Sequence, residues 1–216
     1  MKKMTGLILV VMMLFMQAGV VFAVTKNFSM ILPPATGASI TVFKVVKSGT
    51  APNFTYVFTP WTHGTDLGFS TDAAMIYHTE NDINIWLPQY YFALDVAPTG
   101  GTGNPTVSVS YAQGNNPNGA SGHGLDYKGS ISFSKVTGQT GSQSESVLFY
   151  PVRFGMVASA VGNIVPTNLG ITDGFLRIYI GIGDGSMTGG NSPEVFTNSD
   201  MPGTYTGVLT ITLTTP

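Results

Sequence analysis

The 216-residue chain contains no cysteine, and only 9% of its residues are charged. The absence of cysteine excludes disulfide bonds, thiolate metal sites and cysteine nucleophiles. Charged residues make up about a quarter of an average globular protein. Here nine Lys and Arg residues are set against eleven Asp and Glu residues, for a net charge of −2. This balance provides no basic surface for nucleic acid, so we expect no nucleic-acid partner.

Long apolar runs are also scarce, and the clearest one is at the N-terminus. Residues 1–23 combine two early lysines, an apolar run over residues 7–15 and a small-residue ending at Ala23. These are the three parts of a secretory signal peptide. Gln17 and Gly19 interrupt the apolar run, which leaves it shorter than the roughly 20 residues that a membrane-spanning helix needs. We therefore expect cleavage after Ala23 and an exported mature chain, with a membrane anchor as the alternative.

Long helical periodicity is missing from the rest of the chain, where apolar and polar residues alternate instead. Val107-Ser-Val-Ser-Tyr111 places its apolar side chains on one face, and residues 174–183 place four aliphatic side chains opposite Arg177 and Tyr179. The same pattern predicts strands at residues 39–46, 54–59, 73–78, 90–96, 130–134, 144–150 and 208–214. A short helical turn is expected near residues 154–161. Many short strands between turn-rich stretches predict one all-β domain, a sandwich or a barrel.

The chain also lacks the motifs of common catalytic and metal sites. Its histidines, His63, His78 and His123, stand in no metal-binding pattern, and no nucleophile elbow or phosphate-binding loop is present. The loop that contains Asp184 lacks the spacing of a calcium site. We therefore expect no enzyme activity, no cofactor and no metal. Scattered acids leave a secreted glycoside hydrolase open as a minor alternative.

Aromatic residues leave a second class of function open. Trp61, Trp86, Tyr90, Tyr91 and Phe92 fall within a short stretch of the chain. Aromatic side chains can stack on sugars, although in a β-sandwich they more often fill the core. A secreted carbohydrate-binding or surface-layer module is therefore the alternative function.

The segment after the signal peptide is a short apolar strand that ends in two prolines. Val24, Phe28, Met30 and Leu32 occupy alternate positions, with Lys26 as the polar exception, and Pro33-Pro34 follows directly. Proline cannot donate a hydrogen bond to a sheet. A free apolar strand promotes aggregation unless another strand pairs with it. It can pair in the sheet of its own domain, or it can complete the sheet of a neighbouring subunit.

The C-terminal segment resembles a known family. Met201-Pro-Gly-Thr-Tyr205 forms a turn before an alternating strand over residues 208–214. This ending is typical of chaperone–usher pilins, in particular of the archaic branch and of the related spore coat protein U domains. The apolar strand directly after the signal peptide also matches that family.

The resemblance implies an all-β, immunoglobulin-like β-sandwich that is incomplete and is completed by a donor strand from a neighbouring subunit. Residues 24–34 would form the donor strand and its Pro-Pro hinge, and residues 35–216 the pilin-like domain. The donor side chains would be Val24, Phe28, Met30 and Leu32. The acceptor groove, where a chaperone also docks, would be lined by Tyr205, Leu209, Ile211 and Leu213. The missing disulfide and the terminal Pro216 depart from the family pattern.

The function implied is that of a structural subunit of an extracellular pilus or fimbria, polymerised by donor-strand exchange and serving adhesion or biofilm formation. Its partners would be identical or related pilin subunits, a periplasmic chaperone and an outer-membrane usher, with a host or surface glycan as a possible target. The chain would be secreted through the periplasm to a fimbrium on the cell surface. In the alternative, a sugar-binding or surface-layer module, the N-terminal strand would belong to its own sheet.

Overall fold

A computed structural model describes residues 25–31, 40–50, 53–61, 66–70, 76–78, 83–86, 88, 90–96, 106–137, 145–157, 163–164, 174–185 and 189–214. The predicted signal peptide (1–23) lies outside these residues. So do Val24 and Leu32 of the predicted donor strand, and the Pro33-Pro34 hinge.

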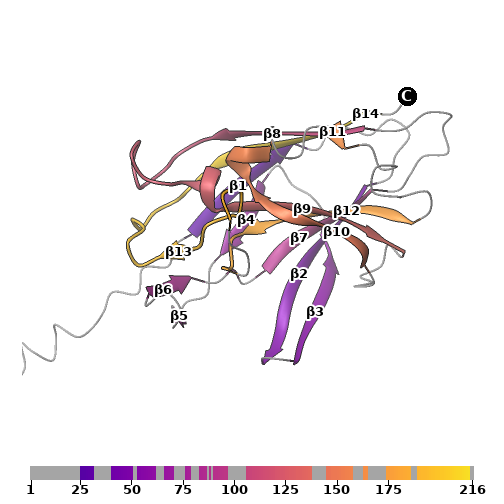
Figure 1. The fold of residues 1–216 in the computed structure, drawn as a ribbon, viewed down its shortest axis with the longest axis horizontal. Helices are drawn as coiled ribbons and strands as arrows, with labels where there is room; N and C mark the ends of the chain where they lie inside the picture. Colours follow the sequence, from indigo (N-terminus) through magenta and orange to yellow (C-terminus); the bar gives the residue numbers. More distant parts are fainter. Residues whose placement is uncertain are drawn as a thin grey trace, which may run out of the picture.

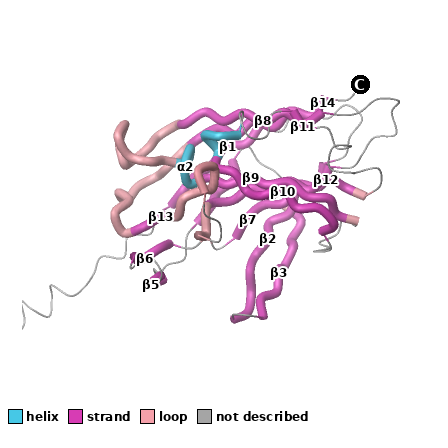
Figure 2. The backbone as a smooth tube through the Cα atoms, viewed as in Figure 1, coloured by secondary structure: helices cyan, strands magenta, loops and turns pink. Residues whose placement is uncertain are grey.

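The described part of the chain is almost entirely β-structure, as predicted (Figures 1 and 2). Its helical elements are one turn of α-helix, α2 (Leu125–Lys128), and a 3-10 turn, η1 (Phe154–Met156), which falls where the sequence predicted a short helical turn. Among these residues no helix is long and apolar enough to cross a membrane. The strands form three sheets.

The first sheet has five strands in the order β11-β8-β14-β1-β4. Their bounds are β11 (Asn163–Ile164), β8 (Thr106–Gln113), β14 (Gly207–Thr214), β1 (Thr25–Ile31) and β4 (Asp66–Ser70). β14 pairs antiparallel with β8 along its whole length. β1 lies parallel to β14 and antiparallel to β4. The strand nearest the N-terminus is therefore an internal strand of this sheet.

The second sheet has six antiparallel strands in the order β10-β9-β12-β7-β2-β3. Their bounds are β10 (Glu145–Arg153), β9 (Gly129–Val136), β12 (Phe175–Ile182), β7 (Tyr90–Val96), β2 (Ile40–Thr50) and β3 (Asn53–Pro60). In Figure 1 the β2–β3 hairpin extends away from the other strands. A small third sheet, in the order β13-β6-β5, contains β13 (Phe196–Thr197), β6 (Ile83–Trp86) and β5 (Ile76–His78).

The main core is built from one face of each of the two larger sheets. The six-stranded sheet contributes residues such as Leu94, Phe133 and Ile178, and the five-stranded sheet contributes Val107 and Leu209. All five are fully buried. Successive residues of a strand point to opposite faces of the sheet, so the alternating apolar residues of the sequence lie on the face that is buried in the core.

The opposite face of the six-stranded sheet is also buried. Phe43, Val45 and Ala93 form a second apolar cluster, with Tyr91 and Tyr179 packed against it. The alternation that places Ile178 in the main core therefore turns its neighbour Tyr179 toward this second cluster.

Within that opposite face, two charges pair across adjacent strands. Arg177 on β12 lies opposite Asp95 on β7. Its Nε and Nη2 atoms donate to the two carboxylate oxygens of Asp95 at 2.6 and 2.8 Å, and neither side chain is exposed. The guanidinium also lies over the ring of Phe58, 4.9 Å from its centre. A bidentate pair of this kind compensates for the removal of both charges from water.

Candidate functional site

The predicted donor and acceptor strands lie side by side in this structure. We call the junction of β1 and β14 the strand seam. In its register Ser29 lies beside Val208, Met30 beside Leu209, and Ile31 beside Thr210. The seam is intramolecular here, because both strands belong to the same chain.

The structure brings one predicted donor residue next to a predicted acceptor residue. Met30 neighbours Leu209, whereas Phe28 lies in register with Leu67 on the other side of β1. The remaining predicted donor residues, Val24 and Leu32, lie outside the described residues.

Three of the four predicted acceptor residues are deeply buried. Tyr205 and Leu209 have no exposed surface, Ile211 is 4% exposed, and all three belong to the main core. Leu213 is in β14, in register with Val107 of β8. The C-terminal strand therefore presents an apolar face inward, directly beside the position that β1 occupies.

β1 connects β4 to the other strands of the five-stranded sheet. β4 is joined to the sheet only through β1 in the strand order of the described residues, and β14 has β1 as the neighbour on one side. Removal of β1 would leave one backbone edge of β14 without a strand partner, and an unpaired edge is a template for another strand. The β14 edge that β1 covers is therefore the candidate functional site.

The hydroxyl of Tyr205 holds the segment directly before β14 in place through hydrogen bonds. Its oxygen lies 2.7 Å from the carbonyl oxygen of Met201 and 3.0 Å from Oδ1 of Asn118, and these two acceptors compete for its single proton. The Tyr205 ring packs edge-on against Phe196, with 5.1 Å between ring centres. Burial raises the pKa of Tyr205 to about 12, and the nearby charge of Asp200 adds to the rise, while the hydrogen bond to Asn118 opposes it.

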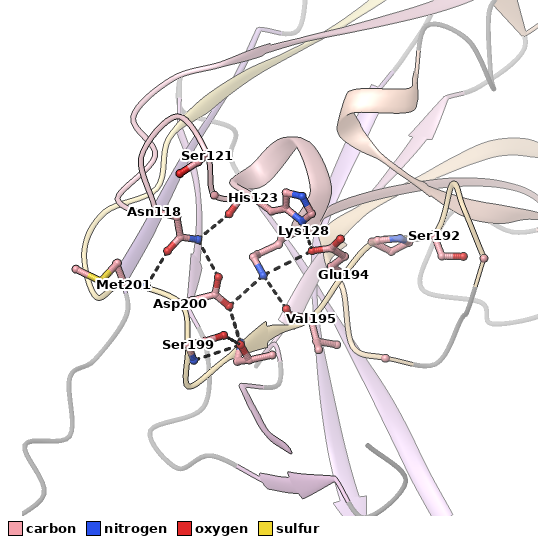
Figure 3. Close-up of a pocket in the computed structure, with 15 residues that line it drawn as sticks. Asn118, Ser121, His123, Lys128, Ser192, Glu194, Val195, Ser199, Asp200 and Met201 are labelled. Carbon is pink, nitrogen blue, oxygen red and sulfur yellow. Dashed lines mark hydrogen bonds and ion pairs between the residues drawn. The ribbon is translucent and has the colours of Figure 1, made fainter. Parts of the chain in front are cut away.

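Asn118 connects this corner to the adjacent loops, as Figure 3 shows. Its side-chain nitrogen donates to the carbonyl oxygen of His123 at 2.7 Å and to Oδ1 of Asp200 at 2.8 Å. Its side-chain oxygen accepts a hydrogen bond from the backbone nitrogen of Met201 at 2.7 Å. One amide thus holds the loop after β8 against the loop before β14.

A nearly buried ion pair lies next to Asn118. Nζ of Lys128 donates to Oδ2 of Asp200 at 3.0 Å and to the carbonyl oxygen of Val195 at 2.9 Å. Oδ2 of Asp200 also accepts from the backbone nitrogen of Thr197 at 2.7 Å. Because the charged groups are already engaged with each other and with the backbone, this pair acts as a structural tie. Sequence reasoning missed it, since no local motif connects residues 72 positions apart.

His123 is exposed, but it has defined partners. Its side chain is 48% exposed, and Nδ1 lies 2.8 Å from Oε2 of Glu194. The imidazole stacks flat on the ring of Tyr127, with 3.7 Å between ring centres. Among the residues that the structure describes, no cluster of three or more His, Cys, Asp or Glu side chains could hold a metal ion.

Comparison with known proteins finds no family model, no curated protein and no solved structure that matches this chain.

Four of the five aromatic residues considered for sugar binding have described side chains, and these four point in different directions; the side chain of Trp86 is outside what the structure describes. Tyr90 packs against the main core, with Nζ of Lys44 3.7 Å from its ring centre. Its neighbour Tyr91 packs on the other side of the sheet against Tyr179, at 5.5 Å. Trp61 is 37% exposed and meets Phe92 edge-on. These rings do not form one flat platform.

Proposed function

We propose that this protein is an exported structural subunit that polymerises by strand exchange into a surface fibre, a pilus or fimbria that serves adhesion or biofilm formation. A β1 strand within its own sheet is also what the sugar-binding alternative expects, so the proposal rests on the place of β1 in the strand order: it lies between β14 and β4, and its removal would open an edge of β14 to another strand. In a fibre, β1 of each subunit would take this position in the next subunit.

The chemistry of the seam supports exchange between subunits. Swapping an identical element between two copies uses the same contacts in both states, so it costs little. Residues 32–39 connect β1 to β2, and a connection of this length reaches roughly 26 Å when extended. Pro33 and Pro34 in this connection have no backbone N–H to donate to a neighbouring strand. The connection is therefore better suited to be a spacer than a continuation of β1.

Burial of an exchanged strand provides the binding energy. A fully buried aliphatic or aromatic side chain contributes roughly 1.5–3 kcal/mol. The apolar positions Val24, Phe28, Met30 and Leu32 would therefore contribute on the order of 6–12 kcal/mol before the cost of ordering the strand. Backbone pairing along β14 would add to this.

The corner at Tyr205 supports the finer assignment of an immunoglobulin-like sandwich. In such folds a tyrosine near the start of a late strand bonds back to the backbone a few residues upstream. The bond of Tyr205 to the carbonyl oxygen of Met201, just before β14, has this arrangement. The proposed partners are further copies or related subunits, with a periplasmic chaperone and an outer-membrane usher during assembly.

The test is an SDS gel of material sheared from the cell surface, loaded with and without boiling. We expect a ladder of multimers without boiling that collapses to the mature monomer on boiling, because no disulfide can link the subunits. A single monomer band in both lanes would contradict polymerisation.

A truncation separates exchange from other modes of assembly. Deletion of residues 24–32 should give a protein that folds only when a peptide of the same sequence is added. A truncated protein that folds alone and still forms multimers would rule out β1 as the exchanged element.

A further inference from the structure

A hollow of about 750 Å³ lies next to the Lys128–Asp200 pair, between the loop after β8 and the loops around β13 (Figure 3). Its walls include Ser121 and His123 from the first loop and Ser192 and Glu194 from the second. Small-molecule sites in proteins have volumes of roughly 300–1,000 Å³. The size of this hollow is that of a binding site, and we call it the loop cavity.

The walls of the loop cavity are held in place before any ligand arrives. The side-chain nitrogen of Asn116 donates to the carbonyl oxygens of Gly119 and Gly122 at 3.1 and 2.8 Å, which fixes the first loop internally. The backbone nitrogen of Glu194 donates to the carbonyl oxygen of Tyr127 at 2.9 Å, which fixes the second loop to α2. A cavity that is rigid in advance loses less entropy when it binds.

Several polar groups of the cavity retain hydrogen-bonding capacity. Within the described part of the chain, the hydroxyls of Ser121 and Ser192 make no hydrogen bond, and Oε1 of Glu194 makes none either. By contrast, Lys128 and Asp200 are engaged with each other and with the backbone. The open groups are two hydroxyls, which can donate or accept, and a carboxylate oxygen, which accepts.

Charge and apolar surface narrow the class of ligand. The charged residues of the cavity wall include one permanent cation, Lys128, and two carboxylates, Asp200 and Glu194. The carboxylates therefore outnumber the permanent cation. An anionic ligand would meet Glu194 without a free cation to offset it. Met201, which is 56% exposed, adds apolar surface at the rim. A ligand with several hydroxyls, no negative charge and an apolar C–H face fits this set.

We propose that the loop cavity binds a neutral saccharide unit, and that this gives the protein a glycan-binding site separate from the strand seam. Glu194 accepts hydrogen bonds from sugar hydroxyls, Ser121 and Ser192 exchange hydrogen bonds with them, and Met201 contacts the C–H face. The site is complete in one chain and does not depend on polymerisation.

Saturation-transfer NMR tests this proposal, because it detects binding through the ligand and works equally for monomers and for large fibres. The probes are D-glucose, D-galactose, D-mannose and N-acetyl-D-glucosamine, with N-acetylneuraminic acid as an anionic comparator. We expect transfer to at least one neutral sugar and none to the anionic one. Lack of transfer to all four neutral sugars, or preference for the anionic sugar, would overturn the proposal.

Matched variants locate the site. Glu194→Gln keeps the size of the side chain but removes its charge, and should weaken binding about tenfold, since the hydrogen bonds that the side chain accepts lose their charge assistance. Ser192→Ala removes a hydroxyl that makes no bond in the fold, and should weaken binding severalfold without affecting folding. Ser110→Ala, an exposed serine on β8, is the control and should bind like the original. Equal binding by all three variants would also overturn the proposal, whereas the gel of sheared material would be unaffected.

Discussion

Met30 and Leu209 are direct neighbours in a parallel strand pair, although they come from opposite ends of the described chain. Parallel strands cannot be joined by a tight turn, and here most of the fold separates them in sequence. The cost of closing so long a loop is entropic and rises only slowly with length. In the proposed exchange, β1 of a second copy would compete for the same position with identical contacts, and the local concentration of subunits would determine which strand binds.

A designed disulfide distinguishes the two arrangements of the seam. Ser29 and Val208 are register neighbours, and adjacent strands lie about 4.8 Å apart, within the Cα separation of about 4.4–6.8 Å that a disulfide accepts. The chain has no cysteine of its own, so Ser29→Cys with Val208→Cys gives an unambiguous readout.

In surface fibres we expect the double variant to form multimers that survive boiling and collapse on reduction. Ser29→Cys alone should give at most dimers. If the double variant yields only an internally bridged monomer, β1 remains in its own chain.

A charge in the seam should block assembly. Met30→Asp would place a carboxylate beside buried Leu209, where a charge without a partner is costly. We expect loss of the multimer ladder with export unchanged, measured on sheared and periplasmic fractions. Ser29→Asp is the matched control, because adjacent strand positions face opposite sides. Normal fibres from Met30→Asp would contradict the proposed donor role.

Truncation of a core residue in β14 should destabilise the domain. Leu209 is fully buried, and leucine-to-alanine changes at such sites cost about 2–5 kcal/mol of unfolding free energy. Val208→Ala, at a half-buried position on the other face, should cost less than half as much. Urea unfolding measures both. Equal effects of the two substitutions would mean that the inward face of β14 is assigned wrongly.

Tyr205 should make stability depend on alkaline pH. Its pKa is near 10 when the chain is unfolded and about 12 in the fold, so the folded state holds the phenolic proton more tightly. This contribution to stability is fully present below pH 10 and is lost as the pH rises toward 12.

Tyr205→Phe should therefore reduce the loss of unfolding free energy between pH 10 and about 12. At neutral pH the same substitution should lower the unfolding free energy by about 1 kcal/mol, because a hydrogen bond is lost. Denaturant unfolding across this pH range measures both effects. Tyr56→Phe, at an exposed position on β3, is the control and should leave the profile as it was. An unchanged alkaline profile in Tyr205→Phe would show that this hydroxyl is not the titrating group.

Removing one partner of the buried pair of Arg177 and Asp95 should lower the unfolding free energy strongly, whereas replacing both with apolar residues should not. Burial raises the pKa of Asp95, and the hydrogen bond and charge of Arg177 oppose that rise. Arg177→Met leaves the carboxylate buried without its partner, and should destabilise the fold by about 3–5 kcal/mol. Arg177→Met with Asp95→Leu should recover much of that loss in urea unfolding. A double variant no better than the single one would mean that the pair stabilises the sheet beyond charge compensation.

Alternation in the sequence predicted the strands that contribute most to the core. The predicted strand at residues 90–96 matches β7, and those at 107–111, 174–183 and 208–214 fall on β8, β12 and β14. β4 and β6 were missed because they are only five and four residues long, too short for alternation to stand out from the surrounding sequence. Their pairing depends on distant strands, which local pattern does not reveal.

The candidate site was predictable only in part, for physical reasons. The alternation of apolar and polar residues predicts that Leu209 and Ile211 are buried. It does not predict whether β1 runs parallel or antiparallel to β14, because an alternating pattern is the same in both directions. The Lys128–Asp200 pair and the loop cavity are formed by segments far apart in sequence, so no spacing rule could indicate them.

The parallel direction of β1 beside β14 would give a fibre a polarity. β1 runs toward the C-terminal end of β14, and its last residue, Ile31, lies beside Thr210. The chain that connects β1 to the body of the donor subunit would therefore begin on that side. In the proposed fibre, the donor body would therefore lie away from Tyr205 and the loops at the start of β14. Each acceptor would keep its loop cavity uncovered, so the fibre would present a repeating row of such cavities along its length, all oriented toward the same end.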